Sequence, residues 1–274
     1  MICLEDVQTH QHGIKNKLIF NIYMKKLNQF ITEKFRLSKD NLTYQHQYNY
    51  YPKTRDELIK IIDELIKERG KNADLNDIDT SEISDMHYMF HGTEFNGDIS
   101  EWNVSNVEDM QGMFSHAAFN GDISQWDVSN VKKMFGMFGG SDFNQDISKW
   151  NVSNVENMNY MFSGTIFNGD ISKWNVSKVK EMCYMFAFSK FNGDISQWNV
   201  SNVKNMNNMF YKCENFKCDL SKWDVSNVED IKEMFAYSKF NGDISKWNVN
   251  KVTNMHKIFH NCPLQKNPPI WYKE

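Results

Sequence analysis

Two pairs of histidines have a spacing that metal sites use. His87 and His91 are four residues apart, and so are His256 and His260. Such a pair can bind zinc when further side chains complete the site. Neither pair has a carboxylate partner in a recognisable motif, and the pairs stand at opposite ends of a repeated region. We therefore predict no functional metal site, and we expect no cofactor.

A column of aspartates suggests a second kind of chemistry. An Asn-Gly-Asp triplet or a variant of it recurs at 96–98, 120–122, 144–146, 168–170, 192–194, 217–219 and 241–243. Stacked carboxylates could supply the oxygen ligands of a calcium ladder. However, each repeat has a single such Asp, without the denser pattern of calcium-binding β-helices. Because Asn and Asp close turns onto their own backbone and Gly supplies positive φ, we favour turn closure.

The remaining reactive side chains form no recognisable catalytic pattern. The five cysteines, at positions 3, 183, 213, 218 and 262, include no CxxC motif, and their number is odd. We therefore expect free thiols that are buried or half-buried. The sequence contains no P-loop, GxGxxG, HExxH or GxSxG motif, and these are the signatures of several large enzyme classes. We predict that the protein is not an enzyme.

Most of the residues named above lie in a repeated unit of 24 residues, which is first complete at 95–118. Its phenylalanine recurs at positions 95, 119, 143, 167, 191, 216 and 240. Its tryptophan recurs at positions 102, 126, 150, 174, 198, 223 and 247. The step is 24 residues except between Phe191 and Phe216, where it is 25. A fixed period in this range is typical of stacked repeats, in which each unit buries its apolar face against its neighbours.

Each unit is predicted to contain a short strand and a short helix. The spacing of Ile99, Trp102 and Val104 matches the strand of a leucine-rich repeat, whose residues alternate inward and outward. The apolar residues within 107–114 then fall on one side of a helical turn, and Ser105 stands where an N-cap is expected. The sequence therefore predicts an α/β repeat solenoid that is leucine-rich-repeat-like, with parallel strands stacked in adjacent turns.

Polar columns on the outward face of the predicted strand are the candidate binding surface. The candidate residues are Asn103, Asp127, Lys149, Asn151, Lys173, Asn175, Asn199, Lys222, Asp224, Lys246 and Asn248. Because this face is polar and monotonous, it suits a repetitive or extended partner better than one small ligand. More varied residues stand at 115–118 and the equivalent positions. They could form a specific protein contact, or a solvated loop whose sequence is free to vary.

A helical cap is predicted before the repeats. Thr54 is a suitable N-cap, Glu57 completes a capping box, and Gly70 is placed to end the helix. The apolar residues between them form one face of this helix. Because the first unit of a stack has an open apolar side, we assign residues 54–77 to a capping helix and the entry to the repeats.

The rest of the chain divides around this cap. Residues 1–53 are predicted to be a leader that contains an amphipathic helix at 16–36 and a linker. The solenoid occupies 78–263, as a half-unit followed by seven repeats. Residues 264–274 break the pattern and offer apolar side chains, including Ile270 and Trp271, to cover the final turn.

Composition and charge argue against several classes of function. The chain has 274 residues and a net charge of -4, without the basic balance that is typical of nucleic-acid binding. No segment is apolar enough to span a membrane. The N-terminus lacks the pattern of a signal peptide, even if translation begins at Met24, and Cys3 has no apolar stretch before it. The sequence as read therefore predicts a cytoplasmic location.

The run FNGDISKWNVSNVxxMxxMF resembles the repeats of BspA-like bacterial surface proteins, which also occur in mycoplasma lipoproteins of unknown function. The resemblance covers about residues 50–263. It implies a leucine-rich-repeat-like solenoid, with adhesion or protein binding in some members and a possible place at the cell surface. We therefore expect a non-catalytic protein that binds an unidentified protein through an extended surface. The alternative is a structural spacer or assembly protein of a bacterium, phage or virus, with no discrete ligand.

Overall fold

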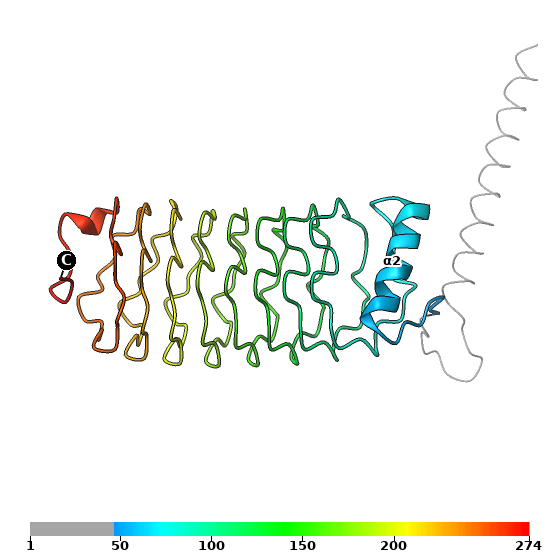
Figure 1. The fold of residues 1–274 in the computed structure, drawn as a ribbon, viewed down its shortest axis with the longest axis horizontal. Coiled ribbons are helices and arrows are strands. Elements are labelled where there is room, and N and C mark those ends of the chain that lie inside the picture. The colour runs from blue at the N-terminus through cyan, green and yellow to red at the C-terminus, as the bar shows by residue number, and fades with distance from the viewer. Residues whose placement is uncertain (1–46, 274) are drawn as a thin grey trace, which may run out of the picture. The chain divides into compact units, whose positions relative to one another are not determined.

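The structure, a computed structural model, describes residues 47–273 (Figure 1). The chain divides into two compact units, Met1–Asn49 and Tyr50–Glu274. The predicted helix at 16–36 and Cys3 lie outside the described residues. The second unit contains the α-helix α2 (Arg55–Arg69), the 3₁₀-helix η1 (Pro263–Gln265) and, between them, a series of similar coils.

Helix α2 forms where the sequence predicts it, between a capping threonine and a glycine. Thr54 Oγ1 accepts the N–H of Glu57 at 3.3 Å, and the Glu57 carboxylate accepts the N–H of Lys53 at 2.7 Å. These bonds satisfy N–H groups near the start of the helix that have no partner within it. Gly70 follows the helix with a φ of 86°, as a glycine C-cap allows. The apolar face buries Leu58, Ile62 and Leu65 in the same hydrophobic core as the repeats.

Residues 71–262 form a stack of coils, one coil per repeat, which we call the repeat stack. Backbone N–H groups of one coil donate to carbonyls of the next, for example Met110 N–H to Lys133 O at 3.0 Å. The stack begins before the predicted half-unit, because Leu75 N–H already donates to Asp98 O at 2.9 Å. Figure 1 shows the coils following one another from α2 toward the C-terminus.

The helix predicted in each repeat is wrong. Residues 109–116 form successive tight turns, in which Met113 N–H donates to Met110 O at 3.3 Å. Alternate N–H groups donate to the next coil, so they are not available for the i to i−4 bonds of an α-helix. Gly112 and His116 have φ values of 57° and 55°, as the third residue of a type II turn requires. We call these segments the turn ladder; they are 85–92, 109–116, 133–140, 157–164, 181–188, 205–212, 230–237 and 254–261.

The strand predicted in each repeat is also wrong. Trp102 N–H donates to Ile99 O at 3.2 Å, and Val107 N–H donates to Val104 O at 2.9 Å, so this segment turns twice instead of extending. Within residues 47–273, pairing of the parallel β type is limited to isolated bridges, most of them at the first residue of the turn ladder. In the same residues α2 is the single α-helix. The predicted α/β, leucine-rich-repeat-like fold class is therefore contradicted.

Aspartate and asparagine side chains produce the turns that replace the strand. Asp98 Oδ1 accepts the N–H of Ser100 at 3.0 Å, and Asn103 Oδ1 accepts the N–H of Ser105 at 3.1 Å. Each bond closes a short turn onto the backbone. The side chain thereby takes a serine N–H that pairing with another strand would use. Equivalent bonds recur in the later repeats.

The glycine of the Asn-Gly-Asp triplet provides space rather than positive φ, which corrects the predicted reason for it. The positive-φ glycines stand at other positions of the repeat. A Cβ at Gly169 would lie 2.9 Å from Cε2 and Cζ of Phe167, closer than carbon atoms pack. Gln145 and Cys218 replace this glycine in two repeats, and there the Phe143 and Phe216 rings are tilted by 15° and 20° from the next ring of the column. In repeats that keep the glycine, the corresponding angle is as small as 3°.

Columns of aromatic rings fill the interior of the repeat stack. The rings of Trp102 and Trp126 lie 6.5 Å apart, with their planes 1° from parallel. Each indole N–H also donates to a carbonyl of an earlier coil, as in Trp150 Nε1 to Ile123 O at 3.0 Å. Because the polar atom of each buried indole has a partner, a column can bury large rings without leaving a polar group unsatisfied.

Residues after the last repeat cover part of the final coil. The Trp271 ring lies 6.3 Å from the Trp247 ring at an angle of 10°, and its N–H donates to Ile244 O at 2.8 Å. Trp271 therefore continues the tryptophan column. Helix η1 contributes Leu264, which is 9% exposed, whereas Ile270 is 92% exposed and covers nothing.

A surface loop absorbs the single 25-residue step. Glu214 and Asn215 are exposed, while Cys213 and Phe216 on either side are fully buried. Lys217 N–H donates to Asn192 Oδ1 at 3.0 Å, so the contact between coils resumes directly after the extra residue. The columns of the core therefore stay in register across the insertion.

Candidate binding surface

The predicted polar columns are on the surface, but they stand on turns rather than on a strand. All of the candidate residues from Asn103 to Asn248 are exposed. The Asn and Asp members each accept the N–H of the residue two positions later; they are Asn103, Asp127, Asn151, Asn175, Asn199, Asp224 and Asn248. Lys149 and Lys173 stand one coil apart, and so do Lys222 and Lys246. The columns are thus part of the turn structure, and their surface is uniform from coil to coil.

Turn closure is confirmed at the aspartate of the Asn-Gly-Asp triplet. The N–H of Ser148 donates to Asp146 Oδ1 at 2.9 Å, and this hydrogen bond lowers the pKa of the carboxyl group. The same contact with the following serine lowers the pKa of Asp170, Asp194, Asp219 and Asp243. The asparagine acts between coils instead, because Asn96 Oδ1 accepts the N–H of Asn120 at 2.8 Å.

The histidines and cysteines take part in local contacts. His87 Nδ1 lies 2.7 Å from Asp85 Oδ1 in one segment of the turn ladder. Among the residues that the structure describes, no three His, Cys, Asp or Glu side chains are placed to hold a metal ion. The four described cysteines are free, as predicted. Burial raises the pKa of the Cys183 thiol to about 12 and that of Cys213 to about 11, so both are protonated at neutral pH.

A row of aromatic side chains lies on the outer surface of the turn ladder. We call this row the aromatic edge; it consists of Phe135, Tyr160, Tyr184, Phe188, Tyr211 and Tyr237. Tyr160 and Tyr184 stack at 4.7 Å with their planes 5° apart, while Tyr211 meets Tyr237 edge to face at 5.5 Å. Tyr160, Phe188 and Tyr237 are 38%, 51% and 39% exposed. The edge therefore presents large side chains to solvent in a fixed arrangement.

The backbone under the aromatic edge is unfavourable for the residues that it carries. Tyr160, Tyr184, Phe188 and Tyr237 have φ values between 54° and 59°. A left-handed conformation costs an L-residue about 1–2 kcal/mol, but costs glycine little. Glycine does occupy the same positions in other coils, at 112, 136, 140 and 164. Polar residues in other coils, such as Glu233, also adopt a positive φ at these positions, so the aromatic residues differ from them in their size and their exposed apolar surface rather than in the backbone.

A lysine adds positive charge to the aromatic edge. Lys212 Nζ lies 5.4 Å from the centre of the Phe188 ring and 5.5 Å from the centres of the Tyr211 and Tyr237 rings, within the range of cation–π attraction. Burial raises the pKa of the Tyr160 and Tyr184 hydroxyls. These phenols therefore remain protonated and able to donate hydrogen bonds at neutral pH.

A family model described as "Mycoplasma protein of unknown function, DUF285" matches residues 61–166, 139–190 and 164–271. The chain belongs to this family. No curated protein and no solved structure matches the chain. The function of the DUF285 family is unknown. Within residues 47–273, no helix combines the length and apolar character needed to cross a membrane.

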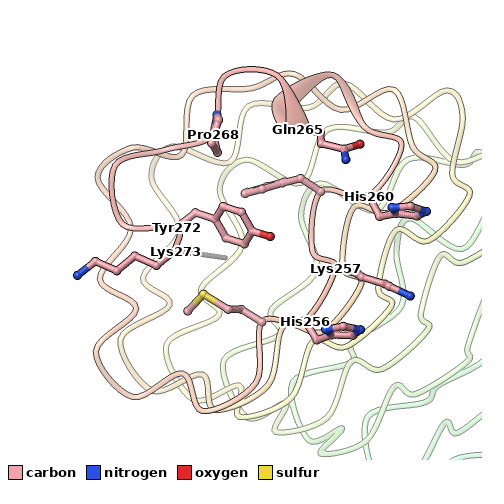
Figure 2. Close-up of a pocket in the computed structure, with 9 residues that line it drawn as sticks. His256, Lys257, His260, Gln265, Pro268, Tyr272 and Lys273 are labelled. Carbon is pink, nitrogen blue, oxygen red and sulfur yellow. The ribbon is translucent and has the colours of Figure 1, made fainter.

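A hollow at the C-terminal end of the repeat stack is a second feature of this DUF285 protein (Figure 2). It has a volume of about 750 Å³. Its lining residues are Met255, His256, Lys257, Phe259, His260, Gln265, Pro268, Tyr272 and Lys273. The second of the two histidine pairs therefore lies at the rim of this hollow, next to Lys257.

The sequence contained a signal for the aromatic edge. Gly112 and Gly136 show that the position is open to the smallest residue, while Tyr160 and Tyr184 occupy it in the next two repeats. The column continues with the buried Asn208 and then with Glu and Lys in later coils, so its side chains vary in size and polarity, unlike the Phe and Trp columns of the core. Interpreting residues 107–114 as a helix concealed this contrast.

Proposed function

We propose that the chain is a non-catalytic binding protein and that the aromatic edge holds a protein partner. The supporting observation is that exposed Tyr and Phe side chains occupy left-handed positions where glycine costs less. Such a cost is tolerated at functional sites because the surrounding structure fixes the conformation. Here the backbone bonds of the turn ladder to the neighbouring coils fix it.

The chemistry of the edge suits a protein surface. Tyrosine and phenylalanine are enriched at protein interfaces, where they offer large contact areas at a low cost in side-chain entropy. Tyr160 and Tyr184 cover one face of each other's ring, which holds the two rings in a fixed arrangement for a partner to contact. Lys212 gives the same surface a positive charge that an acidic group of the partner can approach.

The polar columns are the competing surface for the same function. They offer the same pattern of Asn, Asp and Lys side chains from coil to coil, so a partner on them would have to be extended and repetitive. The resemblance to BspA-like repeats supports adhesion at a cell surface as the finer form of either proposal. A spacer without a ligand remains the alternative function.

Glycine substitution separates the two surfaces. The variant Tyr160→Gly, Tyr184→Gly, Phe188→Gly, Tyr237→Gly removes the side chains while keeping backbone angles that glycine adopts in neighbouring coils. The matched control, Lys149→Glu with Lys173→Glu, changes the polar columns at exposed positions. Partners captured from lysates by the unaltered chain are compared with those captured by each variant. Circular dichroism establishes that each variant is folded.

The outcomes distinguish the possibilities. A partner lost by the glycine variant and kept by the lysine variant supports the aromatic edge. The reverse result moves the binding surface to the polar columns. If the unaltered chain captures no partner from any lysate, the binding function is contradicted and the spacer is favoured.

A further inference from the structure

The last coil of the repeat stack has backbone donors without acceptors. In the preceding coil, Ile231 N–H donates to Asn254 O at 2.9 Å, Glu233 N–H to His256 O at 3.0 Å and Phe235 N–H to Ile258 O at 3.1 Å. The equivalent N–H groups of the last coil belong to Met255, Lys257 and Phe259. None of the three has an acceptor among residues 47–273. Paired backbone N–H groups are the rule in the other coils, so this edge is incomplete.

The edge is shaped to receive one more segment of chain. The donors are two residues apart, as they are in every other segment of the turn ladder. The fourth donor of the series, Asn261 N–H, is satisfied by the side chain of Gln265 at 2.8 Å, which marks one end of the open stretch. An acceptor that matches the other three must present carbonyl groups on alternate residues of a polypeptide.

The hollow beside these donors determines what kind of segment fits. Met255, Phe259 and Tyr272 supply apolar surface, and Lys257 and Lys273 supply positive charge. Among residues 47–273, no carboxylate lines the hollow. Figure 2 shows His256, Lys257 and His260 along one side of the hollow with their side chains directed outward, Tyr272 on the opposite side, and Lys273 directed outward beyond it, so that the positive charges lie at the rim. A segment with acidic side chains therefore meets complementary charge.

The other end of the stack argues against a second copy of this chain as the occupant. There the carbonyl group of His87, on the first segment of the turn ladder, accepts Arg55 Nε at 3.0 Å and Arg55 Nη2 at 2.7 Å. Helix α2 buries its apolar face in the same core. A second copy could offer its first coil to the open edge only by displacing α2.

We propose that the C-terminal edge of the repeat stack binds an extended acidic peptide segment of another protein. The segment adds as a further member of the turn ladder, and its alternate carbonyls accept the N–H groups of Met255, Lys257 and Phe259. Recognition by strand addition to an open edge works in this way, with the main chain supplying binding energy and the side chains supplying selectivity. This site shares no residue with the aromatic edge.

The test uses a synthetic peptide whose register is known from the protein itself. The blocked peptide EDIKEMFAYS has the sequence of Glu229–Ser238. In the chain, the carbonyls of Asp230, Lys232 and Met234 accept three N–H groups of the preceding coil, at 2.9, 2.8 and 2.9 Å. Amide hydrogen exchange of the full chain is measured residue by residue with and without the peptide. We expect the exchange of Met255, Lys257 and Phe259 to slow by about tenfold or more at saturation.

Charge variants test the acidic character of the segment. Lys257→Glu with Lys273→Glu is expected to weaken peptide binding by about tenfold, whereas Lys149→Glu with Lys173→Glu leaves it unchanged. A peptide in which the Glu and Asp residues are replaced by Lys should bind the unaltered chain more weakly by a similar factor.

Two results would overturn the proposal. One is that the three amides are already protected from exchange in the free chain. Another part of the chain or a second copy would then cover the edge, and a dependence of the protection on protein concentration would identify the second copy. The other is that they exchange at the same rate with saturating peptide. Partner binding at the aromatic edge is unaffected by either result, so the two proposals fail separately.

Discussion

At the scale of single residues, asparagine and aspartate oxygens organise the repeat. Asn130 Nδ2 donates to Ser105 O at 2.7 Å in the preceding coil, and Asn120 Oδ1 accepts the N–H of Asn144 at 2.9 Å from the following one. Side chains thus connect the coils at positions where the backbone does not. An amide is suited to this role because it both donates and accepts hydrogen bonds.

The aspartates of the Asn-Gly-Asp column should make stability depend on acid pH. The N–H of the following serine lowers the pKa of Asp146, Asp170 and Asp194 in the folded state. Their contribution is therefore complete above the unfolded pKa of about 4 and is lost as the pH falls through the lower folded value. The variant Asp146→Asn, Asp170→Asn, Asp194→Asn keeps the acceptor but cannot ionise. Urea unfolding between pH 7 and pH 3 should show a smaller loss of stability on acidification for this variant.

The control for this experiment is Asp63→Asn with Glu64→Gln on the exposed face of α2. It should leave the pH dependence as in the unaltered chain. If the free energy of unfolding fell equally with pH in the triple variant and the unaltered chain, the role that we assign to the aspartates would be contradicted.

A methyl group at Gly169 should destabilise the coil, although Gln145 and Cys218 occupy the equivalent position in other repeats. Because the added Cβ would lie 2.9 Å from the Phe167 ring, the ring must shift within a packed column. We expect Gly169→Ala to lower the free energy of unfolding by about 1–3 kcal/mol, measured by urea titration. Lys173→Ala, at an exposed position of the same coil, should change it by less than about 0.5 kcal/mol. An unchanged stability in Gly169→Ala would show that the ring moves without cost.

Residue types alone were sufficient to predict the turn acceptors but not the purpose of the glycine. Asp98 and Asn103 have local partners two residues away, and such partners can be recognised from sequence. The contact that requires glycine also involves a phenylalanine ring held by its neighbours in adjacent coils. That contact depends on how the coils stack, which residue types do not specify.

At the scale of elements, α2 could be predicted because its signals are local. Thr54, Glu57 and Gly70 act within one helix turn of its ends. The helix of the repeat was predicted wrongly because apolar spacing does not distinguish a helix from a series of tight turns, and the strand because it does not reveal the turns that Asp and Asn close. Met110, Met113 and Phe114 face the core in both. The difference lies in the left-handed residues between them, and Gly112 was the one residue of that segment that indicated it.

The tryptophan column should carry a large part of the stability of each coil. Trp150 is 4% exposed, and its indole N–H donates to Ile123 O. We expect Trp150→Ala to lower the free energy of unfolding by about 3–5 kcal/mol, measured by urea unfolding. In Trp150→Phe most of the ring remains and the carbonyl of Ile123 loses its partner, so the cost should fall to about 1–3 kcal/mol. If both variants lost the same stability, the hydrogen bond rather than the buried ring would be the main contribution.

At the scale of the whole molecule, the repeat stack should behave as a sum of coils. Each coil bonds to its two neighbours, so stability is approximately a sum of terms for each coil and each interface. Deleting residues 143–166 removes one period and joins Asp142 to Phe167 in phase. We expect this variant to fold, and its urea m-value to fall by roughly the share of surface in one coil.

Deleting residues 143–162 is the matched control, because it removes 20 residues and shifts every later column out of phase. This variant should lose cooperative unfolding. If the two deletions unfolded alike, the coils would not depend on the phase of their neighbours.

The 25-residue step at Glu214 and Asn215 interrupts the regular 24-residue repeat of the stack, and this has a consequence for folding. In crystallographic terms the stack is a one-dimensional lattice, and the extra residue is a dislocation in it. A collapsing chain can dock the Phe143 ring where Phe119 belongs and still complete nearly every column, with one period looped out as a stacking fault. Such a fault cannot pass the dislocation without moving the extra residue from the surface loop into the core. Register shifts between repeats should therefore be confined to one side or the other of residue 215. The irregular repeat thus limits how far the coils can be misaligned during folding.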